Sequence, residues 1–291
     1  MPAELFLYGG GVTAEHVRWR PAAAVRSFAG WYSGYRQGGP PGPHRGLPSP
    51  YITVVVTIDE PLRVTAHPDP RTPPGTYESL IGGLHTAPAM IANDGHGSGI
   101  QIALSPLGAR AVLGLPAGEL AETDVDAADV LGRFAAELRE RVAAAPDWRS
   151  RFRVVDTMLA RRADPSALPP PEVTYAWQRL CSSDGTVAPS ALAREVGWSG
   201  RYLSRRFGVE IGLAPKVAAR VARFDRARRL LAEHHGRYGL AALAADCGYY
   251  DQAHLTREFT ALAGVPPARW WAEEFRNVQA AEELTPADSA V

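Results

Sequence analysis

The sequence predicts an α+β protein, in which a strand-rich N-terminal domain with following helices precedes an all-α domain of two helix-turn-helix units. Before residue 105 the apolar residues lie in short runs bounded by glycine and proline, which is typical of strands. After Pro106 their period lengthens to about three and a half residues, which indicates helices. Between residues 190 and 271 one helix-turn-helix pattern occurs twice. The 291 residues favour two domains.

The first half of the chain contains the expected strands. We predict them over 28–35 with tight turns, 51–58, 62–64, 79–85 and 99–104. The segment 62–64 is expected to pair back on 51–58, and 93–99 is expected to be a hairpin turn before the last strand. The proline-rich stretches 37–50 and 65–76 are expected to be loops.

Helices are expected from Pro106 onward. The pattern predicts a short helix over 106–113, a longer one from Asp126 to about 145, and a third from Asp147 to about 161. Each aspartate is a suitable N-cap. The stretch 163–171 contains four prolines and is expected to be a stiff linker.

The repeat in the second half is defined by spacing. In each copy an alanine lies four positions before a glycine, and a leucine and a phenylalanine four residues apart follow. These residues are Ala193, Gly197, Leu203 and Phe207 in the first copy, and Ala244, Gly248, Leu255 and Phe259 in the second. The glycine suits the positive φ that ends one helix, and the Leu–Phe pair lies on one face of the next. Because the second phenylalanine is one residue farther from its glycine, the second turn must be one residue longer.

A long helix is expected between the two copies, over 215–235. Pro215 suits its first turn, and an apolar stripe with helical spacing runs from Val217 to Leu231. Such a helix spans roughly 31 Å, and successive major grooves on one face of B-DNA lie about 34 Å apart. A rod of this length could hold two recognition helices in adjacent grooves.

Charge is concentrated in the same region although the whole chain has a net charge of +0. From Arg194 to Arg237, eleven basic residues (ten arginines and Lys216) stand against four acidic ones. A local excess of this kind is what contact with phosphates requires.

These motifs together resemble the DNA-binding region of the AraC/XylS family of bacterial transcription regulators. The resemblance covers residues 190–271 and includes the repeat, the linking helix, Asp251-Gln252, Arg257, and a closing Gly264-x-Pro266-Pro267 with Trp270. It implies a β-rich, cupin-like N-terminal domain that binds an effector, mediates dimerisation, or both. The expected domains are 1–162 for that role, 163–171 as linker, 172–278 for DNA binding, and 279–291 as a disordered tail.

The expected DNA contacts lie on the two recognition helices, on positions directed away from the Leu–Phe pairs. They are Arg201, Tyr202, Ser204 and Arg205 in the first helix, and Gln252, His254, Thr256 and Arg257 in the second. Arginine suits guanine and Gln252 suits adenine. The chain departs from the family at Arg206, where an apolar residue is usual. It also departs at Gly208-Val209, Ala253 and Trp271, and these changes weaken the expected phosphate contacts of the second half-site.

The resulting expectation is a cytoplasmic, sequence-specific regulator that is not an enzyme, with double-stranded DNA as partner. RNA polymerase, a small-molecule effector and a second copy of the chain are further partners that the resemblance implies, whereas no membrane partner, cofactor or metal is expected. The start of the chain does not resemble a signal peptide, and the two cysteines, Cys181 and Cys247, form no metal or redox motif. Aromatic residues of the strands are candidates to line a pocket: Trp19, Trp31, Tyr32, Tyr35, Tyr51 and Tyr77.

Two alternatives remain open. The first is a metal-dependent cupin-like enzyme that carries a DNA-binding tail, with His85 and His96 as ligands. The second is a DNA-binding protein without an effector, controlled by its abundance or by partner proteins.

Overall fold

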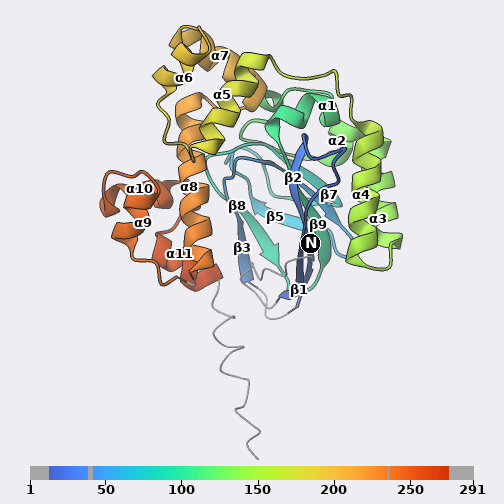
Figure 1. Cartoon of the computed structure of the whole chain (residues 1–291). Coiled ribbons are helices and arrows are strands. Elements are labelled where there is room, and N and C mark those ends of the chain that lie inside the picture. The colour runs from blue at the N-terminus through green and yellow to red at the C-terminus, as the bar shows by residue number, and fades with distance from the viewer. Residues whose placement is uncertain (1–12, 39–41, 235, 275–291) are drawn as a thin grey trace, which may run out of the picture.

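The computed structural model describes residues 13–38, 42–234 and 236–274. Strands and the helices that follow them form the N-terminal half, and helices alone form the C-terminal half (Figure 1). This arrangement confirms the predicted fold class. The expected tail, 279–291, lies outside the described residues.

The larger sheet has six antiparallel strands in the order β1-β2-β9-β4-β7-β10. They are β1 (Thr13–Trp19), β2 (Ala29–Gln37), β4 (Ile52–Thr57), β7 (Ser79–Gly82), β9 (Ser98–Leu104) and β10 (Asp124–Asp126). The central pair, β4 and β9, is rich in β-branched residues, and Ile52, Ile100 and Ile102 are almost completely buried. This sheet therefore supplies much of the N-terminal core.

The smaller sheet has four strands in the order β3-β8-β5-β6. They are β3 (Gly42–Gly46), β5 (Leu62–Ala66), β6 (Gly75–Tyr77) and β8 (Ala89–Asn93). Three expectations were wrong here. The stretch 37–50, expected to be a loop, contains β3, which is held by its pairing with β8. The strand at 62–64 pairs with β6 and β8 instead of folding back on β4. The turn at 93–99 joins strands of different sheets, so it is not a hairpin.

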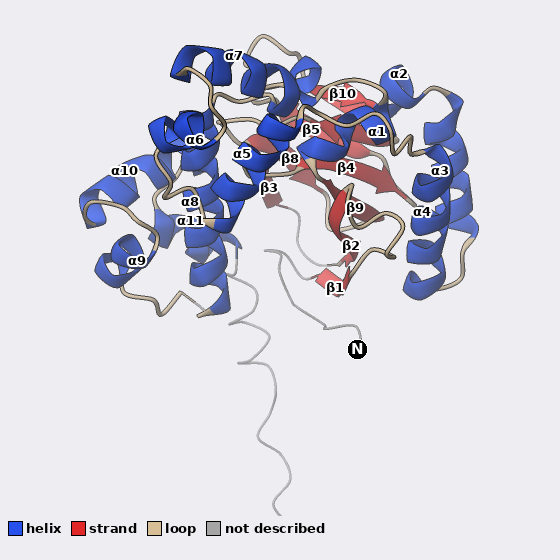
Figure 2. Cartoon of the chain, turned by 45° about the horizontal axis from the view of Figure 1, so that its top comes forward, coloured by secondary structure: helices blue, strands red, loops and turns tan. Residues whose placement is uncertain are grey.

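The helices after the strands cover the larger sheet (Figure 2). One helix was expected over 126–145, but Gly132 interrupts it with φ 59° and ψ −140°, which leaves α2 (Ala127–Leu131) and α3 (Arg133–Ala144). Helix α4 (Trp148–Arg162) begins at its predicted N-cap, Asp147. Its Phe152 is fully buried and stacks on aromatic rings of the sheet and of its own first turn. These rings are Trp19, Tyr32 and Trp148.

Seven helices are described after the linker. They are α5 (Pro171–Ser182), α6 (Pro189–Glu195), α7 (Gly200–Ile211), α8 (Pro215–Glu233), α9 (Leu240–Asp246), α10 (Gln252–Ala263) and α11 (Pro267–Glu274). Figure 1 shows α6 and α7 toward one end of α8, and α9 to α11 toward the other. The predicted long helix is present with 19 residues.

The two helix-turn-helix units have the predicted geometry. Gly197 and Gly248 adopt φ values of 70° and 71° after the first helix of each unit. Ser199 and Asp251 then cap the second helices by accepting a hydrogen bond from a backbone N–H three residues on. The second turn is one residue longer, as the phenylalanine spacing predicted.

The matched glycines differ in their surroundings, which gives a first prediction. A Cβ at Gly197 would meet nothing within 4 Å, whereas one at Gly248 would lie 2.8 Å from the Thr186 Cγ2 methyl. Gly197→Ala should cost about 1–2 kcal/mol from the left-handed backbone alone, and Gly248→Ala should cost more because the methyl group must also move. Denaturant unfolding of both variants checks the order, and equal losses would show that Thr186 moves freely.

The contacts between the N-terminal half and the helical half include one with α7 and one with α11. At one, the 3₁₀ turn η2 (Ala117–Leu120) lies so close to α7 that a Cβ on Gly118 would be 2.4 Å from the Val209 carbonyl oxygen. At the other, Arg45 of β3 pairs with Glu273 of α11 at 2.6 Å, and His44 pairs with Glu274 at 3.2 Å. The N-terminal half thus contacts the first helix-turn-helix unit through η2, and α11, which follows the second unit, through β3.

The His44–Glu274 pair gives a prediction about pH. Burial lowers the pKa of His44, but the charge and hydrogen bond of Glu274 outweigh burial, so the pKa lies above its usual 6.5. The pair should therefore stabilise the fold fully below pH ~6.5 and lose this contribution as pH rises through the raised pKa. Unfolding free energies of the wild type and His44→Gln, measured across this range, should converge at high pH. A constant difference would contradict the assignment.

Candidate nucleic-acid interface

The first recognition helix, α7, has one buried and one exposed face. Leu203 and Phe207 are buried, and Phe207 contacts the Trp177 ring with centroids 6.0 Å apart. The predicted contact residues lie on the other face: Arg201, Tyr202, Ser204 and Arg205 are all exposed. Tyr202 meets the Trp198 ring edge-on at 4.8 Å, and the Arg205 guanidinium lies over Tyr202 at 5.5 Å. These aromatic contacts orient Arg205 at the surface.

The second recognition helix, α10, repeats this division with less exposed polar surface. Gln252 and Arg257 are exposed, whereas His254 and Thr256 are half-buried. His254 Nδ1 accepts the Tyr250 N–H at 3.3 Å, and the Thr256 hydroxyl donates to the Gln252 carbonyl at 2.9 Å. Both side chains therefore already bond to the backbone of α10 or of the turn before it, and Gln252 and Arg257 are the more exposed polar residues of this helix.

The structure divides the basic residues of 194–237 into two groups. The first group stabilises the fold through partners on its own helix or on neighbouring segments. Its members are Arg206 with Glu210, Arg220 with Glu258, Arg223 with the Gly185 carbonyl, Arg226 with Asp184, Arg228 with Asp225, and Arg229 with Asp184 and Asp225. Asp184 and Glu258 lie outside the range, which is why counting charges over 194–237 overstates the excess available to phosphates.

The second group has no ion pair within the described residues. It comprises Arg194, Arg201, Arg205, Lys216, Arg237 and, beyond the range, Arg257. All six are exposed. An unpaired surface cation can approach a phosphate or a base edge without first losing a protein partner. Three of the six lie on the recognition helices.

Two residues that depart from the family pattern, Arg206 and Trp271, contact other parts of the protein. Arg206 turns toward Glu210, one helical turn away, at 3.8 Å, and Glu210 is only 2% exposed. Trp271 packs across Gly236, where a Cβ would lie 2.4 Å from the indole Nε1. Trp271 therefore packs against the turn that precedes α9 and does not replace the phosphate contact of an arginine.

The histidines of the alternative metal site are in different environments. His85 is buried, its Nδ1 bonds to the Ala87 carbonyl at 2.5 Å, and burial lowers its pKa. His96 is exposed. Within the described ranges no group of three or more His, Cys, Asp or Glu side chains is arranged to hold a metal ion. Stoichiometric metal in purified protein, held through both histidines, would revive the enzyme alternative.

Among the cysteines and strand aromatics, Cys247 and Tyr32 are buried, whereas Cys181 and the other five aromatics are half-buried. Cys247 is buried, which raises the pKa of its thiol to about 11, and burial raises the pKa of the Cys181 thiol to about 12. Among the strand aromatics, Tyr32 is fully buried and donates a hydrogen bond to Asp156 at 3.0 Å. None of the described helices has the length and apolar character needed to cross a membrane.

Two family models match different parts of the chain. Residues 192–273 match a family model described as a helix-turn-helix domain. Residues 18–126 match a model described as a domain of unknown function. No curated protein matches the chain.

Several solved structures resemble this fold. An apo variant of ToxT from Vibrio cholerae superposes with a TM-score of 0.50 at 9% identity, covering 83% of this chain and 97% of that one. ToxT with bound unsaturated fatty acid gives 0.49 at 8% identity, with 94% and 98% covered. The C-terminal domain of AraT, a response regulator from Geobacillus stearothermophilus, gives 0.33 at 23% identity, with 35% and 85% covered. At 9% identity, the similarity to the apo ToxT variant shows a shared fold.

The repeated turn, the two capped recognition helices and the linking helix all fall within the matched helix-turn-helix region. The strand-rich half precedes them in the order seen in ToxT. These features show that residues 192–273 form a helix-turn-helix domain, in the region whose motifs resemble the AraC/XylS family of transcription regulators.

Proposed function

We propose that this regulator binds a two-part DNA site by placing α7 and α10 in successive major grooves. The observation that carries the proposal is the division of the basic residues: the recognition helices keep exposed, unpaired cations while the arginines of α8 are paired within the protein. The 19 residues of α8 span roughly 28 Å. This length is comparable with the ~34 Å between grooves.

The proposed contact set keeps all eight predicted residues but ranks them. Arg201, Arg205, Gln252 and Arg257 are the strongest candidates for base edges or phosphates, because their polar ends are exposed. Ser204 and Tyr202 are suited to phosphate contact. Thr256 must give up or share its hydroxyl hydrogen bond to reach a phosphate, whereas His254, which accepts at Nδ1, keeps its Nε2–H as a donor but is half-buried. The first half-site should accordingly be the better defined of the two.

The N-terminal half is proposed to sense a small molecule, to pair with a second copy of the chain, or both. Its contacts, through η2 with α7 and through β3 with α11, support a regulatory role, because they connect the N-terminal half to both ends of the DNA-binding region. The domain ranges proposed for these roles are 1–162 and 172–278, joined by 163–171. Recruitment of RNA polymerase and action in the cytoplasm belong to the same proposal.

Genome-wide mapping of binding sites, followed by titration of the recovered sites in increasing salt, tests the DNA-binding proposal. We expect one shared site with two conserved blocks about one helical turn apart. The logarithm of the affinity should fall linearly with that of the salt concentration, by about 0.9 per phosphate contacted. Binding without a common sequence would contradict the proposal.

A further inference from the structure

Tyr250 is the most exposed large hydrophobic residue that the structure describes. Its side chain is 92% exposed and has no hydrogen bond, ion pair or ring contact within the described residues. A single exposed aromatic residue on a protein surface needs no explanation by itself. The position of Tyr250 is informative, because the residue lies directly before Asp251, the N-cap of the second recognition helix.

The turn of the second unit is longer by one residue, and that residue is Tyr250. In the first unit Trp198 alone separates the turn glycine from the N-cap, whereas Tyr249 and Tyr250 do so in the second. Trp198 meets the ring of Tyr202 edge-on at 4.8 Å, and Tyr249 meets that of His254 edge-on at 5.4 Å. Tyr202 and His254 both lie three residues after the N-cap. Tyr249 therefore takes the place of Trp198, and Tyr250 has no counterpart in the first unit.

The backbone holds Tyr250 at the start of α10. Its N–H donates to His254 Nδ1 at 3.3 Å. The N-terminal residues of a recognition helix are the ones that reach base edges in the major groove. A residue that directly precedes such a helix is therefore at the edge of the groove, beside the phosphates. The hydroxyl of tyrosine is one of the side-chain groups that donate hydrogen bonds to phosphate oxygens.

The N-terminus of α10 itself is not free to bind a phosphate. Backbone N–H groups at a helix N-terminus commonly bind this group. In α10 the Asp251 carboxylate already accepts the His254 N–H at 2.6 Å, and its negative charge repels a phosphate. The first unit has a neutral cap, Ser199. A phosphate contact at this end of α10 therefore requires a donor outside the cap, and the exposed side chain of Tyr250 provides one.

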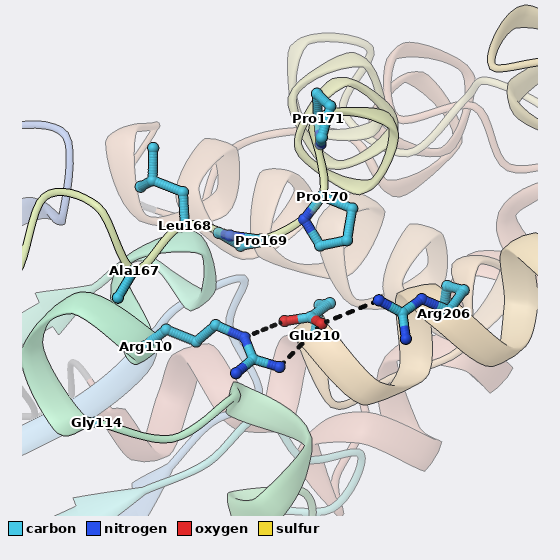
Figure 3. A pocket seen from close by; sticks show the side chains of 9 residues that line it. All are labelled: Arg110, Gly114, Ala167, Leu168, Pro169, Pro170, Pro171, Arg206 and Glu210. Atoms are coloured by element: carbon cyan, nitrogen blue, oxygen red, sulfur yellow. Dashed lines mark hydrogen bonds and ion pairs between the residues drawn. The ribbon is translucent and has the colours of Figure 1, made fainter.

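The second recognition helix also has fewer cations than the first. Helix α7 exposes Arg201 and Arg205, while a third arginine, Arg206, is turned toward Glu210 (Figure 3). Helix α10 has Arg257 alone. An uncharged donor beside α10 would thus add a phosphate contact where positive charge is scarce.

We propose that Tyr250 donates its phenol hydroxyl to a DNA phosphate at the edge of the block read by α10. The inference rests on the proposed function, because it adds a contact to the same DNA interface. The contact fixes the position of α10 along its groove and reads no base. Its contribution is therefore the same on every DNA sequence that α10 occupies.

Tyr250→Phe removes the hydroxyl and keeps the ring. We expect binding to the mapped site to weaken roughly 2- to 13-fold, the range for one neutral hydrogen bond, and binding to random DNA to weaken by the same factor. The dependence on salt should not change, because an uncharged donor releases no counterion, whereas loss of a phosphate-bound cation lowers the slope by about 1. The side chain is in solvent, so the melting temperature should stay at the wild-type value.

Single neutral methylphosphonates, placed in turn along the second block, then locate the contact. At one position the difference in affinity between the wild type and Tyr250→Phe should vanish, because the phosphate that receives the hydrogen bond is altered. At the other positions the difference should remain.

The matched control is Tyr175→Phe. Tyr175 is also an exposed tyrosine, but it lies on α5 and donates to Glu195 at 3.1 Å, so this variant should bind DNA as the wild type does. Unchanged binding by Tyr250→Phe, or an equal loss in Tyr175→Phe, would overturn the inference. A loss on the mapped site without a loss on random DNA would overturn it too, since it would indicate a base contact. The wild type is measured first: if it does not prefer the mapped site, the proposed function itself has failed.

Discussion

Phe259→Ala should lower the free energy of unfolding by about 3–5 kcal/mol, because the ring is fully buried and its removal leaves a cavity among aromatic neighbours. Its centroid lies 4.9 Å from that of Phe224 on α8 and 5.7 Å from that of Trp270 on α11. The side chain thus packs between α8, α10 and α11. Denaturant unfolding of the full chain, followed by far-ultraviolet circular dichroism, measures the loss.

A matched variant exists in the first unit. Phe207 is equally buried, and its described ring contact is with Trp177 of α5. Phe207→Ala should cost a similar amount, but hydrogen exchange should then accelerate in α5 to α7, whereas Phe259→Ala should accelerate it in α9 to α11. Val209, which is 43% exposed, provides the control. Val209→Ala should change stability by no more than about 0.5 kcal/mol. Identical exchange patterns for the two phenylalanine variants would show that the units unfold as one.

The features that the sequence predicts well are local ones. The helix-turn-helix units follow from glycine, alanine and phenylalanine spacings of about four to eleven residues, and the residues that share a helix face are three or four apart. Even the longer second turn follows from the position of Phe259. The break at Gly132 was missed because the apolar period continues across it from Val130 to Phe134.

Features that depend on distant partners were not predictable in the same way. Strand β3 has the sequence GPHRG, without alternating apolar residues, and exists because β8 pairs with it across almost fifty residues. Ion pairs between residues that are distant in the sequence were equally unpredictable. Arg110 and Glu210 are 100 residues apart, and neither has a sequence motif that indicates the other. Arg206 was unusual in the sequence, yet only the structure shows that it shares the Glu210 carboxylate with Arg110.

The local excess of positive charge shows why the candidate interface needed the structure. Arg220 and Arg201 are indistinguishable in a count of charges, but Arg220 pairs with Glu258 at 2.5 Å and Arg201 is exposed without an ion pair among the described residues. The acid that neutralises Arg220 is 38 residues away. The sequence indicates a basic region, and the fold decides which cations remain available to DNA.

Arg201→Ala should weaken binding to the preferred DNA site by about 1–3 kcal/mol, which is roughly 5- to 150-fold. The same change should leave binding to random DNA nearly unaffected if Arg201 reads a base edge, because non-specific binding depends on phosphates. Arg220→Ala is the matched control. It should change stability by about 1 kcal/mol or less, since its ion pair is partly exposed, and should leave the ratio of specific to random binding unchanged.

The second recognition helix extends this test. Arg257→Ala should weaken the preferred site by a similar 1–3 kcal/mol, and the double variant should lose about the sum of the two, because distant sites without shared partners act independently. Binding assays on the mapped site, on random DNA and on sites with one block scrambled separate the outcomes. Scrambling the block read by α10 should abolish the effect of Arg257→Ala and leave that of Arg201→Ala intact. If scrambling either block changed both effects alike, the two helices would not read separate half-sites, and the proposed placement in successive grooves would be wrong.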